Sequence, residues 1–162
     1  MKDIESCEGT VQFIIWEPKE DKPMIQLIVG NKGEGKTKHL LDRVNSQIKT
    51  ASGNIVYLDK NNKHMHELDN KVRLINVAEY PLQNCSEFIG FLCGVISQDY
   101  DLEQMYLDSF LKIAHLEGAD LEAPLKELDK ISEQFKVTMV ISMSVEEDDL
   151  PEFAKERVLV SC

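Results

Sequence analysis

The feature that most constrains the fold is a short apolar run that leads through a glycine-rich stretch into a helical pattern. Residues 24–29 read MIQLIV, which is too short for a helix and typical of a β-strand buried on both faces. Three glycines follow within residues 30–35, and residues 36–49 then carry apolar side chains at helical spacing. This stripe consists of Leu40, Leu41, Val44 and Ile48. A buried strand that turns directly into an amphipathic helix predicts an α/β fold.

The same alternation of strand and helix continues along the chain. Further strands are predicted at residues 54–58, 72–77, 104–107, 137–143 and 158–161. Helices are predicted at residues 86–97 and 110–116, in a segment with Pro124 in its first turn, and in a short segment that ends near Arg157. We therefore expect a mostly parallel sheet flanked by helices on both faces, connected by right-handed crossovers.

The predicted helices carry signals for their ends and faces. Asn84 with Glu87, and Asp149 with Glu152, have the spacing of capping boxes. The helix at residues 86–97 is so apolar that we expect near-complete burial. The helix that contains Pro124 is expected to pack one apolar stripe against the core. Its members are Leu121, Leu125, Leu128, Ile131 and Phe135.

The length of 162 residues fits one domain, and the alternating pattern occupies residues 24–162. Residues 1–23 fit the pattern less well and are expected to form an N-terminal extension. Residues 10–16 read TVQFIIW and predict an extra strand, joined to the domain by a charged turn at residues 17–23. Met24 stands directly before the first core strand, so an extension placed upstream of a compact domain is the alternative.

Charge and composition exclude several classes of function. With 18 basic and 29 acidic residues the net charge is −11, whereas proteins that neutralise nucleic-acid phosphates usually present a basic face. Residues 1–10 lack the features of a secretory signal, and the most apolar window, residues 88–96, is far shorter than the ~20 residues of a membrane span. Four scattered cysteines are interpreted as buried or idle thiols in a reducing cytoplasm: Cys7, Cys85, Cys93 and Cys162. We therefore expect a cytoplasmic protein that binds neither membranes nor nucleic acid.

Residues 30–37 read GNKGEGKT and match the phosphate-binding pattern G-x-x-x-x-G-K-[ST]. Its glycines let the backbone approach an anion closely, and the N–H groups of the loop and of the following helix then point at the bound phosphates. Lys36 is expected to reach the β- and γ-phosphates, and the Thr37 hydroxyl to coordinate Mg²⁺. The pattern therefore predicts binding of ATP with Mg²⁺. The expected contact residues are Gly30, Asn31, Lys32, Gly33, Glu34, Gly35, Lys36, Thr37 and Lys38.

Through residues 30–37 and the flanking strand and helix, the chain resembles the P-loop NTPases. It departs from the variant K-G-G-x-G-K-[ST], because Asn31 and Lys32 occupy the positions of the first lysine and glycine of that variant. Residues 24–143 also resemble small clostridial and related bacterial ATP-binding proteins that are often labelled as twitching-motility ATPases. The acidic and histidine boxes of the retraction ATPases are absent from the sequence, so only nucleotide binding is carried over. The resemblance implies a three-layer P-loop NTPase fold with a RecA-like sheet.

Two carboxylates follow apolar runs and are candidates for the metal side of the site. Asp59 follows IVYL and Asp108 follows MYL. In RecA-like proteins the strand after the P-loop helix is not adjacent to the P-loop strand, while a later one is, so the resemblance favours Asp108 for the metal. Asp59 then corresponds to a position where such proteins keep a residue that polarises water. A helix-capping role is the alternative for Asp108.

The residues expected for rapid hydrolysis are incomplete. Ser109 follows Asp108, where many ATPases carry glutamate, and Asn61 stands two positions after Asp59. Ser142 or Ser144, at the end of a predicted strand, is a candidate contact to the γ-phosphate. We therefore expect a slow or partner-activated ATPase whose catalytic residues are Lys36, Asp108 and Asp59.

Two other functions stay open from the sequence. A small-molecule kinase is one, although three arginines in the whole chain do not provide an arginine-rich lid. A nucleotide-gated interaction module without hydrolysis is the other. His64 and His66 are interpreted as a solvated pair, because side chains two residues apart diverge on a helix.

Overall fold

The computed structural model describes residues 5–6, 23–33 and 35–162. Seven strands form one sheet in the order β1-β7-β2-β6-β5-β3-β4. All the pairings in this sheet are parallel, which confirms the predicted α/β class with a parallel sheet. The strands are β1 (Glu5–Ser6), β2 (Ile25–Val29), β3 (Asn54–Asp59), β4 (Arg73–Asn76), β5 (Leu102–Leu107), β6 (Thr138–Met143) and β7 (Val158–Ser161).

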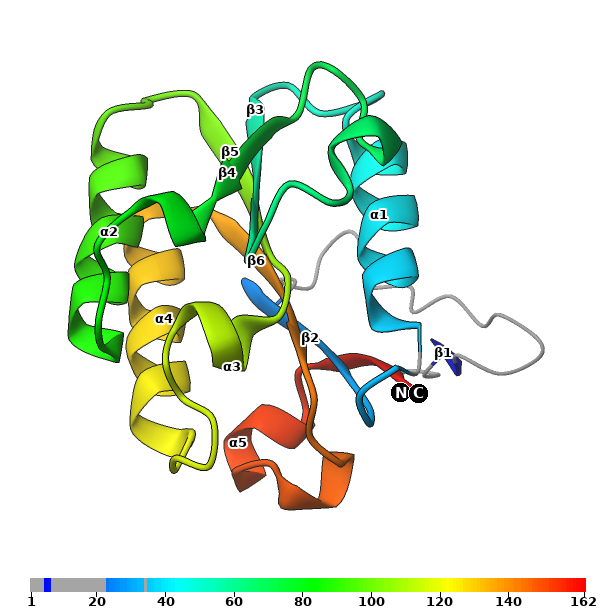
Figure 1. Ribbon diagram of the computed structural model, residues 1–162, viewed down its shortest axis with the longest axis vertical. Coiled ribbons are helices and arrows are strands. Elements are labelled where there is room, and N and C mark those ends of the chain that lie inside the picture. The colour runs from blue at the N-terminus through cyan, green and yellow to red at the C-terminus, as the bar shows by residue number, and fades with distance from the viewer. Residues whose placement is uncertain (1–4, 7–22, 34) are drawn as a thin grey trace.

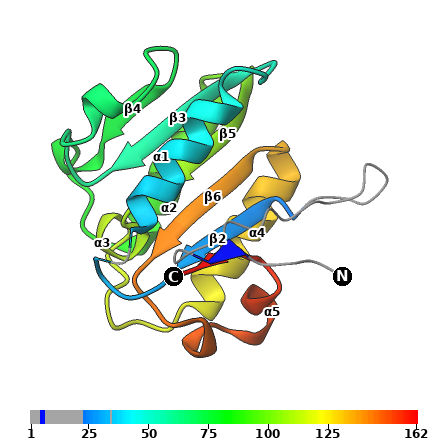
Figure 2. The ribbon, with the colours of Figure 1, turned by 90° about the vertical axis from the view of Figure 1, so that its right-hand side faces the viewer.

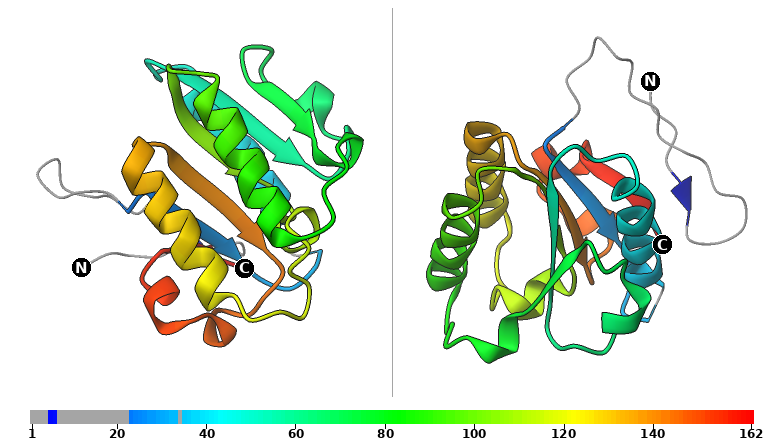
Figure 3. Two further views of the ribbon diagram at one scale, coloured as in Figure 1. Left: turned by 90° about the vertical axis from the view of Figure 1, so that its left-hand side faces the viewer. Right: turned by 90° about the horizontal axis from the view of Figure 1, so that it is seen from above.

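Helices cover both faces of the sheet (Figures 1 and 2). Helix α1 (Lys36–Gln47) lies alone on one face, whereas α2 (Cys85–Ser97) and α4 (Glu122–Phe135) lie side by side on the other (Figure 3). The short helices α3 (Phe110–Ile113) and α5 (Glu152–Lys155) pack on the same side as α2 and α4. Three 3₁₀ turns complete the described elements: η1 (Met65–Glu67), η2 (Val77–Glu79) and η3 (Glu147–Asp149).

Two hydrophobic cores separate the three layers. Strand β2 is buried along its whole length. Its side chains alternate between the two faces of the sheet, and helices cover both faces. Leu27 and Val29 join the core beneath α2 and α4, whereas Ile28 joins the core beneath α1. Helix α1 contributes Leu40, Leu41 and Val44 to its core, three of the four residues of the predicted stripe.

The strand order places several carboxyl ends together. Strand β6 lies between β2 and β5, and β3 follows on the far side of β5. Since every pairing is parallel, these strands end at the same edge of the sheet, where α1 begins (Figure 1). After β2 the chain crosses to β3, whereas the last strand, β7, returns to the other side of β2. In open parallel sheets such a reversal of direction creates a crevice that suits a ligand.

Two predictions about the helices are wrong. Helix α2 fully buries only Phe88, Leu92 and Ile96, and its Gly90 and Gly94 are exposed, because the helix covers the sheet with one face only. Phe135, the last residue of α4, has 47% of its surface exposed, whereas the other four members of its predicted stripe are buried.

The two predicted capping boxes have different outcomes. The Asn84 side chain accepts a hydrogen bond from the Glu87 backbone N–H at 2.9 Å, which confirms the N-cap of α2. The second box is wrong, because Pro151 is the N-cap of α5 and no side chain caps it. Asp149 belongs to η3 and therefore stands too early in the chain to cap α5.

The predicted strand at residues 10–16 lies outside the described residues, and the sequence patterns did not indicate β1. Cys85 and Cys93 are free thiols, but Cys162 is disulfide-bonded, so the interpretation of all four cysteines as idle thiols is wrong. Across the described residues, no helix combines the length and the apolar composition that a membrane span requires.

Candidate functional site

The glycine-rich loop between β2 and α1 has a backbone that side chains would disturb. At Gly30, φ is +150°, and an added Cβ would lie 2.7 Å from the Cβ of Cys162, which follows β7. Gly35 is the N-cap of α1 and has φ +85°, a left-handed conformation that favours glycine. Between them Asn31, Lys32 and Gly33 are exposed, while Glu34 lies outside the described residues.

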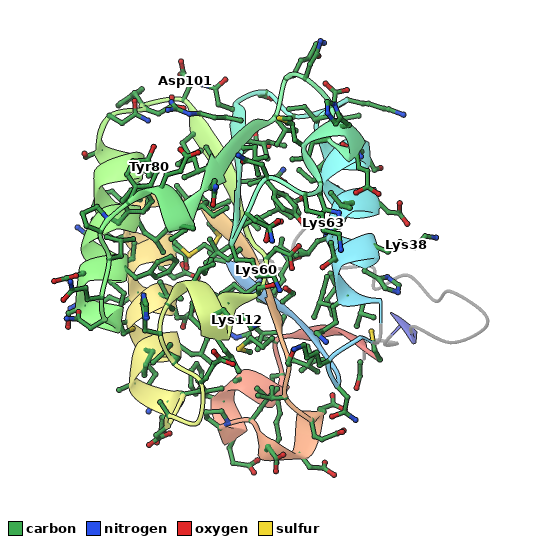
Figure 4. All side chains as sticks on the ribbon, viewed as in Figure 1. Lys38, Lys60, Lys63, Tyr80, Asp101 and Lys112 are labelled. Carbon is green, nitrogen blue, oxygen red and sulfur yellow. The ribbon has the colours of Figure 1, made fainter. Side chains whose placement is uncertain are left out.

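Lys36, the first residue of α1, folds back over this loop. Only 8% of its surface is exposed, and its Nζ donates a hydrogen bond to the Asn31 carbonyl at 2.6 Å. Lys38 behaves differently, because its side chain is 82% exposed and pairs with Asp42 at 3.9 Å (Figure 4). Of these two lysines, the structure brings only the Lys36 side chain to the loop.

Asp108 follows β5 and connects three elements of the fold. Its Oδ1 accepts hydrogen bonds from Thr37 Oγ1 at 3.2 Å and from Ser142 Oγ at 2.9 Å. Its Oδ2 accepts a bond from the Tyr57 hydroxyl at 2.7 Å. Burial, followed by the nearby Asp108 carboxylate, raises the pKa of Tyr57, so the hydroxyl keeps its proton and remains a donor. Asp108 thus joins the start of α1 to β3 and β6.

Asp108 does not cap the following helix, so the capping alternative is wrong. The N-cap of α3 is Ser109, and the Ser109 N–H donates to Ser142 Oγ at 3.0 Å. Strand β5 is the second neighbour of β2 rather than the first, because β6 lies between them. Asp108 nevertheless reaches Thr37, since β5 and β2 end at the same edge of the sheet.

Asp59 is the last residue of β3 and is as buried as Asp108, with 2% of its surface exposed. Its Oδ1 accepts a hydrogen bond from the Lys60 N–H at 2.7 Å, but its Oδ2 has no partner among the described residues. Burial and the charge of Asp108 raise the pKa of Asp59 to about 6, although the Lys60 N–H and the positive charges of His64 and Lys60 oppose this shift. A buried carboxylate oxygen without a donor is unfavourable and marks a place for a ligand.

These groups line one cavity of about 770 Å³ at the carboxyl edge of the sheet. Five lysines and three carboxylates among the described residues face it, which makes this lining richer in basic groups than the acidic chain as a whole. The lysines are Lys32, Lys36, Lys60, Lys63 and Lys112, and the carboxylates are Asp59, Asp108 and Glu117. The other lining residues are Gly33, Gly35, Thr37, Asn61, His64, Ser109, Leu111, Gly118, Ser142 and Ser144.

Several of these residues were not predicted. Lys60, Lys63 and His64 follow β3, whereas Lys112 lies in α3 and Glu117 lies just beyond it. Their position after strands that end at one edge is the only signal that could have identified them, and it becomes visible only when the strand order is known. Ser142 and Ser144 both line the cavity, as expected for the end of β6.

The cavity presents hydroxyl and carboxylate oxygens beside lysine ammonium groups, a combination that suits an anion together with a hard cation. Oxygen ligands of this kind are those that Mg²⁺ prefers. Within residues 5–6, 23–33 and 35–162, histidine, cysteine and carboxylate side chains form no cluster of three or more that could hold a metal alone. His64 instead contacts Glu67, and His66 is exposed and lies outside the cavity lining.

No protein-family model matches this chain, and no curated protein shows significant sequence similarity to it.

Proposed function

We propose that this protein is a P-loop NTPase with a RecA-like sheet that binds ATP with Mg²⁺ and hydrolyses it slowly or when a partner activates it. The observation that carries this proposal is the contact between Thr37 and Asp108. These residues are 71 positions apart in the chain, and both were expected at the metal on independent sequence grounds. Their 3.2 Å hydrogen bond supports a shared role at one ion.

The loop from Gly30 to Thr37 holds the phosphates in this proposal. Helix α1 begins directly after the loop, so its first N–H groups and the positive end of its dipole favour an anion there. The Lys36 ammonium donates to the Asn31 carbonyl at 2.6 Å. A bound phosphate oxygen would replace that neutral acceptor with a charged one, and such hydrogen bonds are roughly twice as strong as neutral ones.

The Thr37 hydroxyl would hold Mg²⁺, and Asp108 would hold the water shell of the ion. Bound Mg²⁺ would neutralise charge on the β- and γ-phosphates. Asp108 is oriented for this role by Tyr57 and Ser142, which donate to its two oxygens. Strand β6 separates the P-loop strand β2 from the Asp108 strand β5, so the assignment of Asp108 rests on its contact with Thr37 and not on adjacent strands.

Slow turnover follows from the groups around the expected γ-phosphate. Asp59 Oδ2 accepts no hydrogen bond from the described residues, so it is available to accept one from a water molecule. The described lining of the cavity contains no arginine, and arginine fingers raise phosphoryl-transfer rates by ~10³–10⁵. A partner that supplies such a cation would therefore increase the rate.

Equilibrium binding of a fluorescent ATP analogue tests the proposal. Mg²⁺ is present at about 5 mM, roughly the concentration that saturates nucleotide in vitro. Lys36→Ala should weaken binding by about tenfold or more, because a charge-assisted hydrogen bond contributes ~1.5–3 kcal/mol. Lys49→Ala is the matched control, since Lys49 is exposed beyond the end of α1 and should leave affinity within about twofold. Equal binding by wild type and Lys36→Ala would refute the proposal. Binding without phosphate release in the same preparation would favour the nucleotide-gated module over the ATPase.

A further inference from the structure

The cavity extends beyond the phosphate-binding loop. Of its 18 lining residues in the described part of the chain, five belong to the loop and the start of α1, namely Lys32, Gly33, Gly35, Lys36 and Thr37. The others lie at the ends of β3, β5 and β6 or in the segments that follow them. The cavity volume of about 770 Å³ lies toward the upper end of the ~300–1,000 Å³ range of small-molecule sites. The side of the cavity formed by β3 and α3 is therefore lined by residues that do not belong to the phosphate-binding loop.

Three lysines outside the phosphate motif gather on that side. Lys60 and Lys63 follow β3, and Lys112 lies in α3 (Figure 4). All three are exposed, and none makes an ion pair within the part of the chain that the structure describes. By contrast, Lys38, Lys126, Lys136 and Lys155 each pair with a carboxylate on their own helix or at its end. Lys60, Lys63 and Lys112 thus present cationic groups to the cavity that no ion pair among the described residues engages.

Asp59 lines the same side of the cavity, and its Oδ2 is buried. Asp59 lies next to Lys60 in the chain, lines the same cavity, and is 2% exposed. Because this oxygen has no donor among the described residues, the site is complete only when a ligand supplies one. A ligand that fits must therefore carry negative charge for the lysines and a hydroxyl group for Asp59.

We propose that the side of the cavity between β3 and α3 binds a second small ligand, a phosphate- or carboxylate-bearing molecule with a hydroxyl group, beside the triphosphate. Lys60, Lys63 and Lys112 bind its anionic group, and Asp59 Oδ2 accepts a hydrogen bond from its hydroxyl. A polyanionic macromolecule fits less well, because the net charge of −11 repels a long anion beyond this cavity. The inference rests on the proposed function, since the loop side of the cavity is assigned to ATP.

Inorganic phosphate and sulfate are the probes, because hydrogen phosphate carries a P–OH donor near neutral pH and sulfate carries none. The protein is first saturated with Mg²⁺ and a non-hydrolysable ATP analogue, which fills the loop side, and each anion is then titrated calorimetrically at constant ionic strength. Phosphate should bind saturably and about tenfold tighter than sulfate, because a hydrogen bond to a charged acceptor contributes ~1.5–3 kcal/mol. Asp59→Asn should abolish this preference.

The triple variant Lys60→Ala/Lys63→Ala/Lys112→Ala should weaken phosphate binding by at least about tenfold. The matched control is Lys49→Ala/Lys71→Ala/Lys130→Ala, which removes the same charge from exposed positions outside this cavity and should keep phosphate affinity within about twofold. Equal losses in the two triple variants, or an equal preference in wild type and Asp59→Asn, would overturn the inference. So would a single-stranded oligonucleotide that displaces phosphate.

The two proposals fail in different ways. If the ATP analogue does not bind, the proposed function fails and the second site fails with it. If the analogue binds but phosphate does not, only the second site is refuted. Circular dichroism and thermal melting of each variant distinguish lost binding from lost folding, and the exposed lysines should leave the melting temperature within about 2 °C of the wild-type value.

Discussion

The ends of strands β3 and β5 differ in a way that separates structural from ligand-binding carboxylates. Asp59 and Asp108 terminate neighbouring strands, face the same cavity, and are equally buried, with 2% of each surface exposed. Asp108 accepts hydrogen bonds from Thr37, Tyr57 and Ser142, whereas Asp59 Oδ2 accepts none from the described residues. The fold alone supplies hydrogen-bond donors to both oxygens of Asp108, whereas Asp59 Oδ2 depends on a ligand for its donor.

This difference shows why burial by itself does not identify a functional carboxylate. A buried charge is costly unless donors surround it, and three hydroxyl groups offset that cost at Asp108. At Asp59 one backbone N–H is the described hydrogen-bond donor, and the pKa is raised to about 6. Proteins retain such unfavourable arrangements mainly at sites that do chemistry or bind ligands.

The largest effect is expected from removing the satisfied carboxylate. Asp108→Ala leaves the Tyr57 hydroxyl, which is fully buried, without its acceptor, and it also removes the acceptor of Ser142. We expect the free energy of unfolding to fall by about 3 kcal/mol, because each buried unsatisfied group costs ~1–3 kcal/mol. Urea denaturation measures this change.

Tyr57→Phe in the Asp108→Ala background provides the control. Phenylalanine removes the orphaned hydroxyl, so the double variant should be more stable than the sum of the single changes predicts, by about 1–2 kcal/mol. Strictly additive effects would show that the bond between Tyr57 and Asp108 contributes little to the free energy of unfolding. The difference between Asp108 and Asp59 would then have no effect on stability.

An effect of opposite sign is expected at Asp59. Its pKa of about 6 in the folded protein exceeds the ordinary 3.8, so the folded state binds the proton more tightly than the unfolded chain does. The free energy of unfolding therefore falls as pH rises through this window, and it stays lowered above pH ~6. Asp59→Asn removes this loss, and at pH ~8 it should stabilise the unliganded protein by about 1–2 kcal/mol.

Denaturation at pH ~5.5 and at pH ~8 tests this sign, because the advantage of Asp59→Asn should be smaller by about 1 kcal/mol at the lower pH. A variant that is less stable than wild type at both pH values would contradict the idea that Asp59 is unsatisfied. The same variant should lower any ATP turnover, so stability and activity should change in opposite directions.

Local patterns in the sequence predicted local structure well. The strand, glycine-rich turn and helix at residues 24–49 are confirmed because each signal lies within a few neighbouring residues. The burial of α2 was overestimated, since composition records how apolar a helix is but not how many of its faces are covered. The disulfide of Cys162 was missed because cysteine spacing alone does not show which cysteines form a disulfide.

The site was only partly predictable for the same reason. The order of strands along the chain favoured Asp108 over Asp59 for the metal, and the contact between Thr37 and Asp108 agrees with that preference, although the role in metal binding stays a prediction. Lys63 and Lys112 carry no sequence pattern, and they line the same cavity because β3 and β5 are adjacent. The side-chain orientation that separates Asp59 from Asp108 depends on Tyr57 and Ser142, and no local signal encodes it.

The smallest effect is expected from the charges that surround Asp59. The positive charge of Lys60 lowers the pKa of Asp59, and the negative charge of Asp108 raises it. Lys60→Ala keeps the backbone N–H that donates to Asp59, so only the charge is lost, and the Asp59 pKa should rise by a few tenths of a unit. Asp108→Asn should lower it instead. Titration of the Asp59 carboxyl carbon by NMR measures both shifts, and shifts of the same sign would mean that the variants alter burial rather than charge. Opposite shifts would establish that the charge of Asp108, whose oxygens accept hydrogen bonds from the fold, raises the pKa of Asp59, whose Oδ2 accepts none from the described residues.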